Sequence, residues 1–134
     1  MIKLNDIMNE LIGNPFIDSV KLTTNKNGLK YIVMNTNFLD NINDSICLYI
    51  EDKNGKLIVS DDGYTAFNYS CFDQNNLFKD SFKRNVKNSN IKLNKDEITT
   101  EYKDPTDICD ILSTILMMYG YLQRIIDTAK VDNK

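Results

Sequence analysis

Two neighbouring carboxylates, Asp61 and Asp62, stand between a strand-like segment and a short helical one. A carboxylate pair at such a junction can ligate a metal ion, contact a partner protein or cap the following helix. In the capping interpretation Asp62 or Ser60 accepts N–H groups of a helix that begins near Tyr64, and Gly63 allows the close turn. The catalytic interpretation is the least favoured of the three. The candidate partner contacts here are therefore Asp61, Asp62, Gly63 and Tyr64, with capping as the structural alternative.

A second pattern, Glu51-Asp52-Lys53, has the Glu-x-Lys spacing of metal-dependent nucleases. Those enzymes need a second carboxylate on a neighbouring strand. The nearest candidates, Asp61 and Asp62, lie at the other end of the same predicted hairpin, roughly 15 Å away at about 3.3 Å per residue. A divalent-metal-dependent nucleic-acid enzyme that uses Asp61 and Asp62 is therefore kept only as the alternative function.

Composition lowers the expectation of enzymatic chemistry. The chain of 134 residues contains no histidine, the usual acid–base group and metal ligand near neutral pH. The net charge of −3 has the wrong sign for nucleic-acid binding by the whole surface. No Gly-rich phosphate loop, nucleophile motif or dinucleotide fingerprint is present. We expect no enzymatic activity, no cofactor and no metal, and nucleic acid is an unfavoured partner.

The three cysteines and the apolar segments indicate a cytoplasmic protein. Cys47, Cys71 and Cys109 are odd in number and widely spaced, which is typical of unpaired thiols in a reducing compartment. The start of the chain has an acidic residue too early for a signal peptide. The longest strongly apolar run, from Ile115 to Tyr119, is far shorter than a membrane span. We therefore expect no membrane association.

A basic ridge recurs every four residues at Lys79, Lys83 and Lys87, with Arg84 beside it. Such a ridge could contact an acidic partner or a nucleic-acid backbone. It is also what the solvent-facing side of an amphipathic helix looks like, and Asp80 dilutes its charge. No aromatic residues alternate with these cations to stack on bases.

The segment from Leu116 to Tyr121 carries more apolar side chains than one buried helix stripe requires. Methionine and tyrosine suit adaptable interfaces. Met117, Met118 and Tyr121 are therefore candidates for self-association, and burial of this helix on two sides is the alternative.

Periodicity predicts a single α+β domain with an antiparallel sheet of about four to six strands, an N-terminal helix, two short central helices and a long C-terminal helix. The polar tail follows residue 130. The predicted helices cover about 5–12, 64–72, 76–86 and 106–129, and the predicted strands cover 17–24, 29–35, 46–50, 56–59, 91–93 and 98–102. Residues 37–44 are expected to form a loop. The hairpin turn at Lys53-Asn54-Gly55 is expected to be longer than two residues.

The strand ending in Val59 and Ser60, followed by Asp61-Asp62-Gly63-Tyr64-Thr65, resembles a family of small bacterial proteins of unknown function. Pro15-Phe16 and Leu48-Tyr49-Ile50 match two further elements of that family. The likeness covers about residues 10–95. It implies a shared fold, and an origin in low-GC bacteria, their phages or mobile elements. It carries no catalytic residues with it.

The function expected from these observations is non-enzymatic binding to a host protein by a phage or mobile-element protein. The partner envisaged is a defence nuclease complex, which would make the chain an inhibitor of anti-CRISPR or anti-restriction type. A structural homodimer through the last helix is a third possibility. The abundance of Asn, Lys and Ile fits an AT-rich genome.

Overall fold

The computed structural model describes residues 3–72 and 77–132, with side chains described as far as residue 129. Its elements, in chain order, are α1 (Leu4–Leu11), β1 (Ile17–Thr24), β2 (Lys30–Leu39), β3 (Ser45–Lys53), β4 (Lys56–Ser60), α2 (Tyr64–Ser70), α3 (Leu77–Asn85), β5 (Lys92–Asn94), β6 (Glu97–Glu101) and α4 (Pro105–Asp132). This is the expected α+β architecture, and the sheet has six strands.

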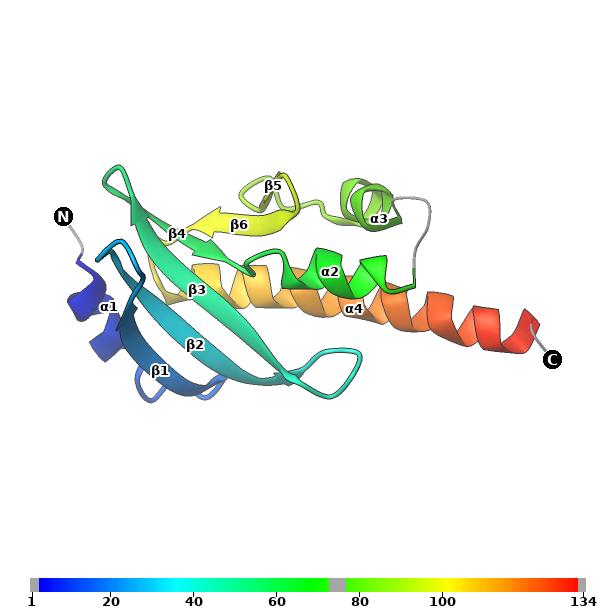
Figure 1. Ribbon diagram of the computed structural model, residues 1–134, viewed down its shortest axis with the longest axis horizontal. Coiled ribbons are helices and arrows are strands. Elements are labelled where there is room, and N and C mark those ends of the chain that lie inside the picture. Colours follow the sequence, from blue (N-terminus) through cyan, green and yellow to red (C-terminus); the bar gives the residue numbers. More distant parts are fainter. Residues whose placement is uncertain (1–2, 73–76, 133–134) are drawn as a thin grey trace.

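The strands form one antiparallel sheet in the order β1-β2-β3-β4-β6-β5 (Figure 1). Lys53 pairs with Lys56, so only Asn54 and Gly55 connect β3 to β4. The expectation of a longer turn was therefore wrong. Asn54 and Gly55 both have positive φ, which a two-residue hairpin turn requires, and Ile50 still lies opposite Val59 on the core face.

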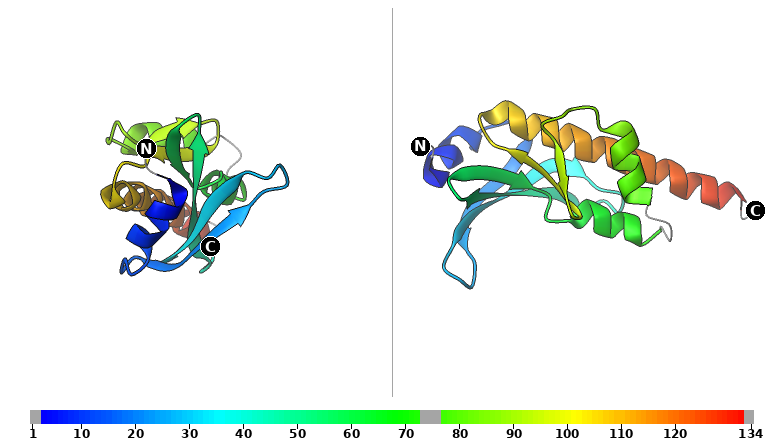
Figure 2. Two further views of the ribbon diagram at one scale, coloured as in Figure 1. Left: turned by 90° about the vertical axis from the view of Figure 1, so that its left-hand side faces the viewer. Right: turned by 90° about the horizontal axis from the view of Figure 1, so that it is seen from above.

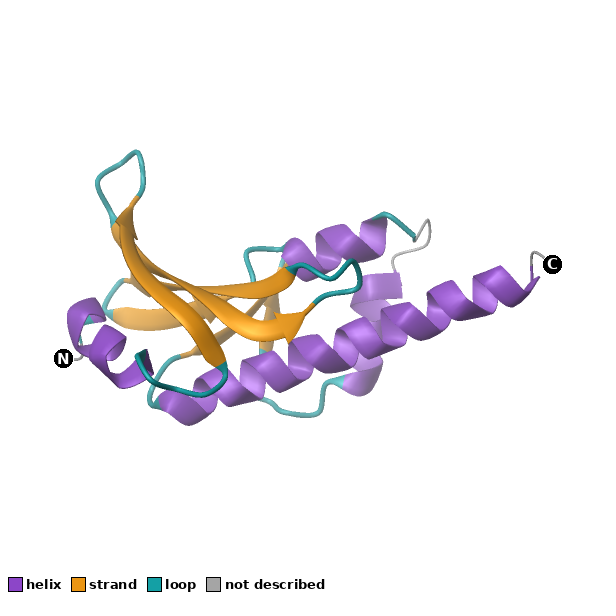
Figure 3. Ribbon diagram, turned by 90° about the horizontal axis from the view of Figure 1, so that it is seen from below, coloured by secondary structure: helices purple, strands orange, loops and turns teal. Residues whose placement is uncertain are grey.

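One face of the sheet is buried because its strands alternate apolar and polar side chains. Ile32 and Met34 of β2 and Leu48 and Ile50 of β3 are fully buried. The helices α1 and α4 lie along this face, as the view from below shows (Figure 3). The buried stripe of α4, which includes Ile111 and Ile115 among others, completes the core.

The long helix α4 begins where the sequence predicts. Pro105 is the first residue of α4, where the fixed φ of proline suits a helix. The Asp104 carboxylate accepts the backbone N–H of Thr106 at 2.8 Å. The Asp107 carboxylate accepts the backbone N–H groups of Lys103 and Asp104 at 2.7 and 3.0 Å. The C-terminal turns of α4 extend beyond the rest of the domain (Figure 2).

The predicted helices and strands are confirmed with small shifts in their bounds, and one loop was misplaced. β2 continues to Leu39, so the predicted loop at 37–44 is shortened to the segment from Asp40 to Asp44. Thr36 explains the continuation, since its hydroxyl donates to the carbonyl of Ile46 at 2.8 Å and holds β2 against β3. The predicted start of the second central helix at Asn76 lies outside the described residues.

Within residues 3–72 and 77–132, no helix is long and apolar enough to cross a membrane.

Candidate functional site

The side chain of Asp61 organises the junction between β4 and α2. Its Oδ1 accepts the backbone N–H groups of Gly63 at 3.0 Å and of Ile98 at 2.9 Å, and its Oδ2 accepts the N–H of Thr65 at 3.2 Å. Only 2% of Asp61 is exposed. Asp61 therefore caps the start of α2 and joins it to β6, whereas the predicted capping residues were Asp62 or Ser60.

Two opposing effects act on the Asp61 carboxyl group. Burial raises its pKa above the ordinary value, because the charged form loses hydration. The hydrogen bonds from Thr65, Gly63 and Ile98 act in the other direction and offset part of that rise. The group is thus enclosed by its own chain, and the geometry gives it a structural role rather than that of an accessible contact.

The three residues that follow Asp61 lie at or near the surface. Asp62 and Gly63 both have left-handed backbone, with φ of 58° and 76°, which turns the chain sharply into α2. The Ser60 hydroxyl accepts the N–H of Asp62 at 2.9 Å, so the backbone of Asp62 is fixed while its side chain stays exposed. Tyr64 is also exposed. These three candidates therefore remain available for contact.

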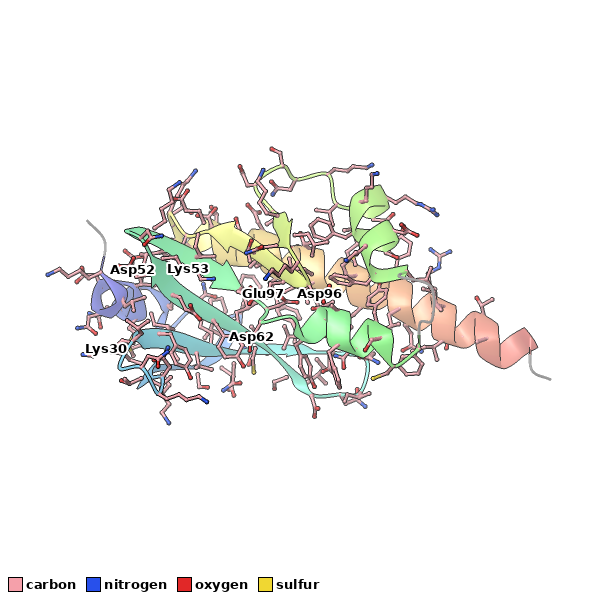
Figure 4. All side chains as sticks on the ribbon, turned by 45° about the horizontal axis from the view of Figure 1, so that its top comes forward. Lys30, Asp52, Lys53, Asp62, Asp96 and Glu97 are labelled. Atoms are coloured by element: carbon pink, nitrogen blue, oxygen red, sulfur yellow. The ribbon has the colours of Figure 1, made fainter. Side chains whose placement is uncertain are left out.

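Acidic side chains from two loops gather around this junction. Figure 4 shows Asp62 near Asp96, which lies in the turn between β5 and β6, and near Glu97, the first residue of β6. The Ser60 hydroxyl lies 3.2 Å from Glu97 Oε1, so the turn is attached to the end of β4. Among the described residues no group of three or more acidic or thiol side chains is arranged to hold a metal ion.

The Glu-x-Lys pattern is separated from the acidic pair as its spacing predicts. Glu51 pairs with Ile58 and Tyr49 pairs with Ser60, which places Asp61 beyond the far end of the hairpin. Figure 4 shows Lys53 near the hairpin turn and Asp62 at the opposite end of β4. Glu51 and Asp61 therefore cannot share one metal ion.

An apolar patch lies next to the acidic junction. We use this name for four exposed side chains on α2, at the end of β2 and on the loop between β2 and β3: Leu39 (52% exposed), Ile42 (56%), Tyr64 (40%) and Phe67 (61%). The rings of Tyr64 and Phe67 stack, with centroids 6.3 Å apart. The β2–β3 loop lies near α2 (Figure 3), since its carboxylates Asp40 and Asp44 contribute to the raised pKa of the Tyr64 hydroxyl.

Buried hydrogen bonds hold both halves of the patch. In the loop, Asp40 Oδ1 accepts the N–H groups of Ile42 at 2.8 Å and Asp44 at 3.0 Å. Under α2, the Asn68 amide donates to the Tyr119 hydroxyl at 2.8 Å, and the Tyr69 hydroxyl donates to the carbonyl of Met118. The apolar side chains are thus presented by a fixed backbone.

The electrostatic environment of the patch is acidic. Asp40 and Asp44 contribute to the raised pKa of the Tyr64 hydroxyl, after burial, which is the largest cause. Asp40 Oδ2 is buried and has no hydrogen-bond partner among the described residues. The segment from Leu39 to Ser45 and helix α2 contain no Lys or Arg.

Leu39, Ile42 and Phe67 carry no sequence signal that marks them as contact residues. Leu39 and Ile42 were assigned to a loop, where apolar residues carry no periodic signal. Phe67 was included in a predicted amphipathic helix, whose apolar side was expected to be buried. Tyr64 was found, because it follows the acidic pair directly.

The basic ridge lies on one helix and the segment after it. Lys79, Lys83 and Arg84 belong to α3, and Lys87 follows that helix. All four basic side chains are exposed, whereas Phe78 is the buried residue of α3. This is the arrangement of a solvent-facing helix side, and it is separate from the apolar patch.

The three self-association candidates are divided by the fold. Met118 is fully buried in the core, so it cannot form an interface, and its selection as a surface residue was wrong. Met117 and Tyr121 are half-buried, and they flank the exposed Gly120 on α4. Only these two remain at the surface.

The fold and the junction together define a small α+β domain with an acidic strand-to-helix turn beside an exposed apolar patch. Residues 36–117, more than half of the chain, match a family described as a domain of unknown function, DUF1828. The chain belongs to this family. The match includes the acidic junction and extends into α4, beyond the range of 10–95 expected from the resemblance. No curated protein and no solved structure matches the chain.

Proposed function

We propose that this chain is a non-enzymatic protein-binding module and that the apolar patch is its contact surface. The observation that carries the proposal is the exposure of Tyr64 and Phe67 on α2, with Leu39 and Ile42 exposed beside and within the neighbouring β2–β3 loop. Exposing several large apolar side chains together is unfavourable in water and is typical of interaction sites. Aromatic side chains on a fixed backbone are also the residues that contribute most to protein interfaces.

The surroundings of the patch suggest the chemistry of the partner. Asp40, Asp44 and Asp62 surround it, and neither α2 nor the β2–β3 loop offers a cation. A partner with an apolar centre and Lys or Arg at its edge would be complementary, since opposite charges at the edge favour encounter and orientation. Asp62 and Tyr64 would contact such a partner, while Asp61 holds the backbone beneath them.

We further propose that the partner is a host protein of the nuclease-defence class and that the chain acts as an inhibitor carried by a phage or mobile element. This finer proposal is supported by the family resemblance and by the AT-rich type of composition. Such an inhibitor would occlude a basic surface on the nuclease with its preformed acidic and apolar one.

The test compares two double variants that remove equal numbers of exposed apolar side chains. Tyr64→Ser/Phe67→Ser changes the patch, and Ile12→Ser/Leu29→Ser changes two exposed positions elsewhere, 62% and 65% exposed. A purified CRISPR or restriction nuclease complex from a low-GC bacterium is assayed for DNA cleavage and for binding by calorimetry. Wild type and the Ile12/Leu29 variant should bind and inhibit, and the Tyr64/Phe67 variant should do neither.

Two results would overturn the proposal. Equal binding by both double variants would remove the patch as the contact surface. Divalent-metal-dependent nuclease activity of the chain itself, lost in Asp62→Ala, would replace the binding module with the alternative enzyme.

A further inference from the structure

A surface cavity of about 370 Å³, lined mostly by polar and charged residues, lies at the edge of the sheet, away from the apolar patch. Lysines from three separate parts of the chain line it: Lys56 at the start of β4, Lys92 at the start of β5 and Lys103 between β6 and α4. Lysines that far apart in sequence come together only because β4, β6 and β5 are adjacent in the sheet. The cavity therefore has a convergent positive lining that sequence spacing does not reveal.

Strand register makes room for this cavity. β5 pairs with β6 only from Glu97 to Thr99, so Thr100 and Glu101 extend beyond their neighbour. The turn that contains Ser89 and Asn90 closes the opening, and it is attached by a hydrogen bond of 3.1 Å from the Thr100 hydroxyl to the carbonyl of Asn90. The wall of the cavity is thus held by backbone structure.

Neutral donors accompany the lysines. Ser89, Asn90 and Thr99, whose side chains carry hydroxyl or amide groups, line the same cavity. These groups can donate hydrogen bonds to an anion. Together with three ammonium groups, they offer donors from several directions.

Two carboxylates also line the cavity, and they differ in their hydrogen-bond partners. Asp107 Oδ2 accepts the N–H groups of Lys103 and Asp104, at 2.7 and 3.0 Å, so this oxygen is already occupied, although the carboxylate keeps its negative charge. Glu101 extends from β6 opposite Ile58 and has no such partners among the described residues. Three lysines therefore share the cavity with two carboxylates, which leaves one positive charge in excess among the lining side chains.

We infer that this cavity binds a phosphate group. A phosphate monoester presents more acceptor oxygens and more negative charge than a carboxylate, and a nucleic-acid backbone repeats singly charged phosphates along the strand. Either suits three separate ammonium donors, and lysine binds phosphate as a point charge. The volume lies near the lower end of ligand sites, which span about 300–1,000 Å³, so the bound group is small. The phosphate belongs either to a free mononucleotide or to the backbone of a nucleic-acid strand that continues over Lys83 and Lys87.

The experiment titrates the full chain with three probes: inorganic phosphate, adenosine monophosphate and a single-stranded DNA dodecamer. Binding is followed by calorimetry and by backbone amide NMR shifts. The shifts should be centred on Ser89, Asn90 and Thr99–Glu101. If the ligand is a free nucleotide, adenosine monophosphate should bind, and Lys83→Gln/Lys87→Gln should not change its affinity. If the ligand is a nucleic-acid backbone, the dodecamer should bind more tightly than the monophosphate, and the same two substitutions should weaken its binding.

Matched variants distinguish binding at this cavity from nonspecific electrostatic attraction to surface lysines. Lys56→Gln/Lys92→Gln/Lys103→Gln should weaken binding at least about tenfold, a change of about 1.4 kcal/mol. The control Lys21→Gln/Lys26→Gln/Lys30→Gln removes the same charge from the β1–β2 hairpin and should have little effect. Glu101→Gln should strengthen binding, which a purely structural role for this cavity would not produce.

The inference fails if no probe binds at millimolar concentration to wild-type protein of native thermal stability. It also fails if the two triple variants weaken binding equally, or if Glu101→Gln does not strengthen it. Because these variants leave Tyr64 and Phe67 unchanged, failure here is independent of the proposed protein-binding function.

Discussion

Asp61 and Ile98 are joined by two hydrogen bonds of different kinds. The backbone N–H of Asp61 donates to the carbonyl of Ile98 at 3.2 Å, and the N–H of Ile98 donates to Asp61 Oδ1 at 2.9 Å. The carboxylate thus takes the place of a backbone carbonyl at the point where β4 ends at Ser60. One side chain thereby connects β4, α2 and β6.

Replacing Asp61 should therefore affect stability rather than direct contact. Asp61→Asn keeps one acceptor oxygen but presents an amide N–H₂ to a buried N–H group, so the free energy of unfolding should fall by about 1–3 kcal/mol. Asp62→Asn, at an exposed position, should leave it unchanged within error. Urea denaturation of both variants measures the difference, and equal effects would contradict the assignment of Asp61 as the cap.

The sequence shows that one of these carboxylates could cap the helix, but not which one. The choice depends on the positive φ of Asp62 and Gly63 and on the position of Ile98, which is 37 residues further along the chain. Hydrophobic periodicity, in contrast, predicts the six strands and four helices well, because burial of one face determines it locally. The lysine-lined cavity depends on which strands are neighbours, and the apolar patch depends on how α2 lies against the β2–β3 loop, so sequence spacing shows neither.

Alkaline pH should destabilise the fold through two buried tyrosines. Burial raises the pKa of Tyr69 and of Tyr119 to about 12, against 10.0 for an unperturbed tyrosine. The protonated form is favoured in the folded state, so this contribution to stability is complete below pH 10 and is lost as the pH rises from about 10 to about 12. The free energy of unfolding should decline over that range.

The measurement is urea denaturation at intervals from pH 9 to pH 12, with tyrosinate absorbance recorded in parallel. In Tyr69→Phe the decline should be shallower, because one of the titrating groups is removed. It should not vanish, since burial also raises the pKa of Tyr102. A decline of the same steepness in Tyr69→Phe would show that Tyr69 titrates normally in the folded protein.

Two adjacent methionines on α4 should respond differently to truncation. Met118 is fully buried, so Met118→Ala should lower the free energy of unfolding by about 2–5 kcal/mol through lost burial and a cavity. Met117 is half-buried on the outer side of the helix, and Met117→Ala should cost markedly less. Thermal and urea denaturation compare them. A larger loss for Met117 would mean that the outer side of α4 is covered in solution.

Gly120 provides the sharpest test of that outer side. It is exposed within α4, and a Cβ added there would meet no atom within 4 Å. Glycine inside a helix costs about 1 kcal/mol relative to alanine, so Gly120→Ala should raise the free energy of unfolding by about that amount if the chain is a monomer.

In a homodimer with helices crossing near Gly120, the added methyl group would instead obstruct the partner helix. The variant would then be less stable than wild type, and the loss would depend on protein concentration. Sedimentation velocity alongside denaturation, with Gln123→Ala as an exposed control on the same helix, distinguishes the two cases.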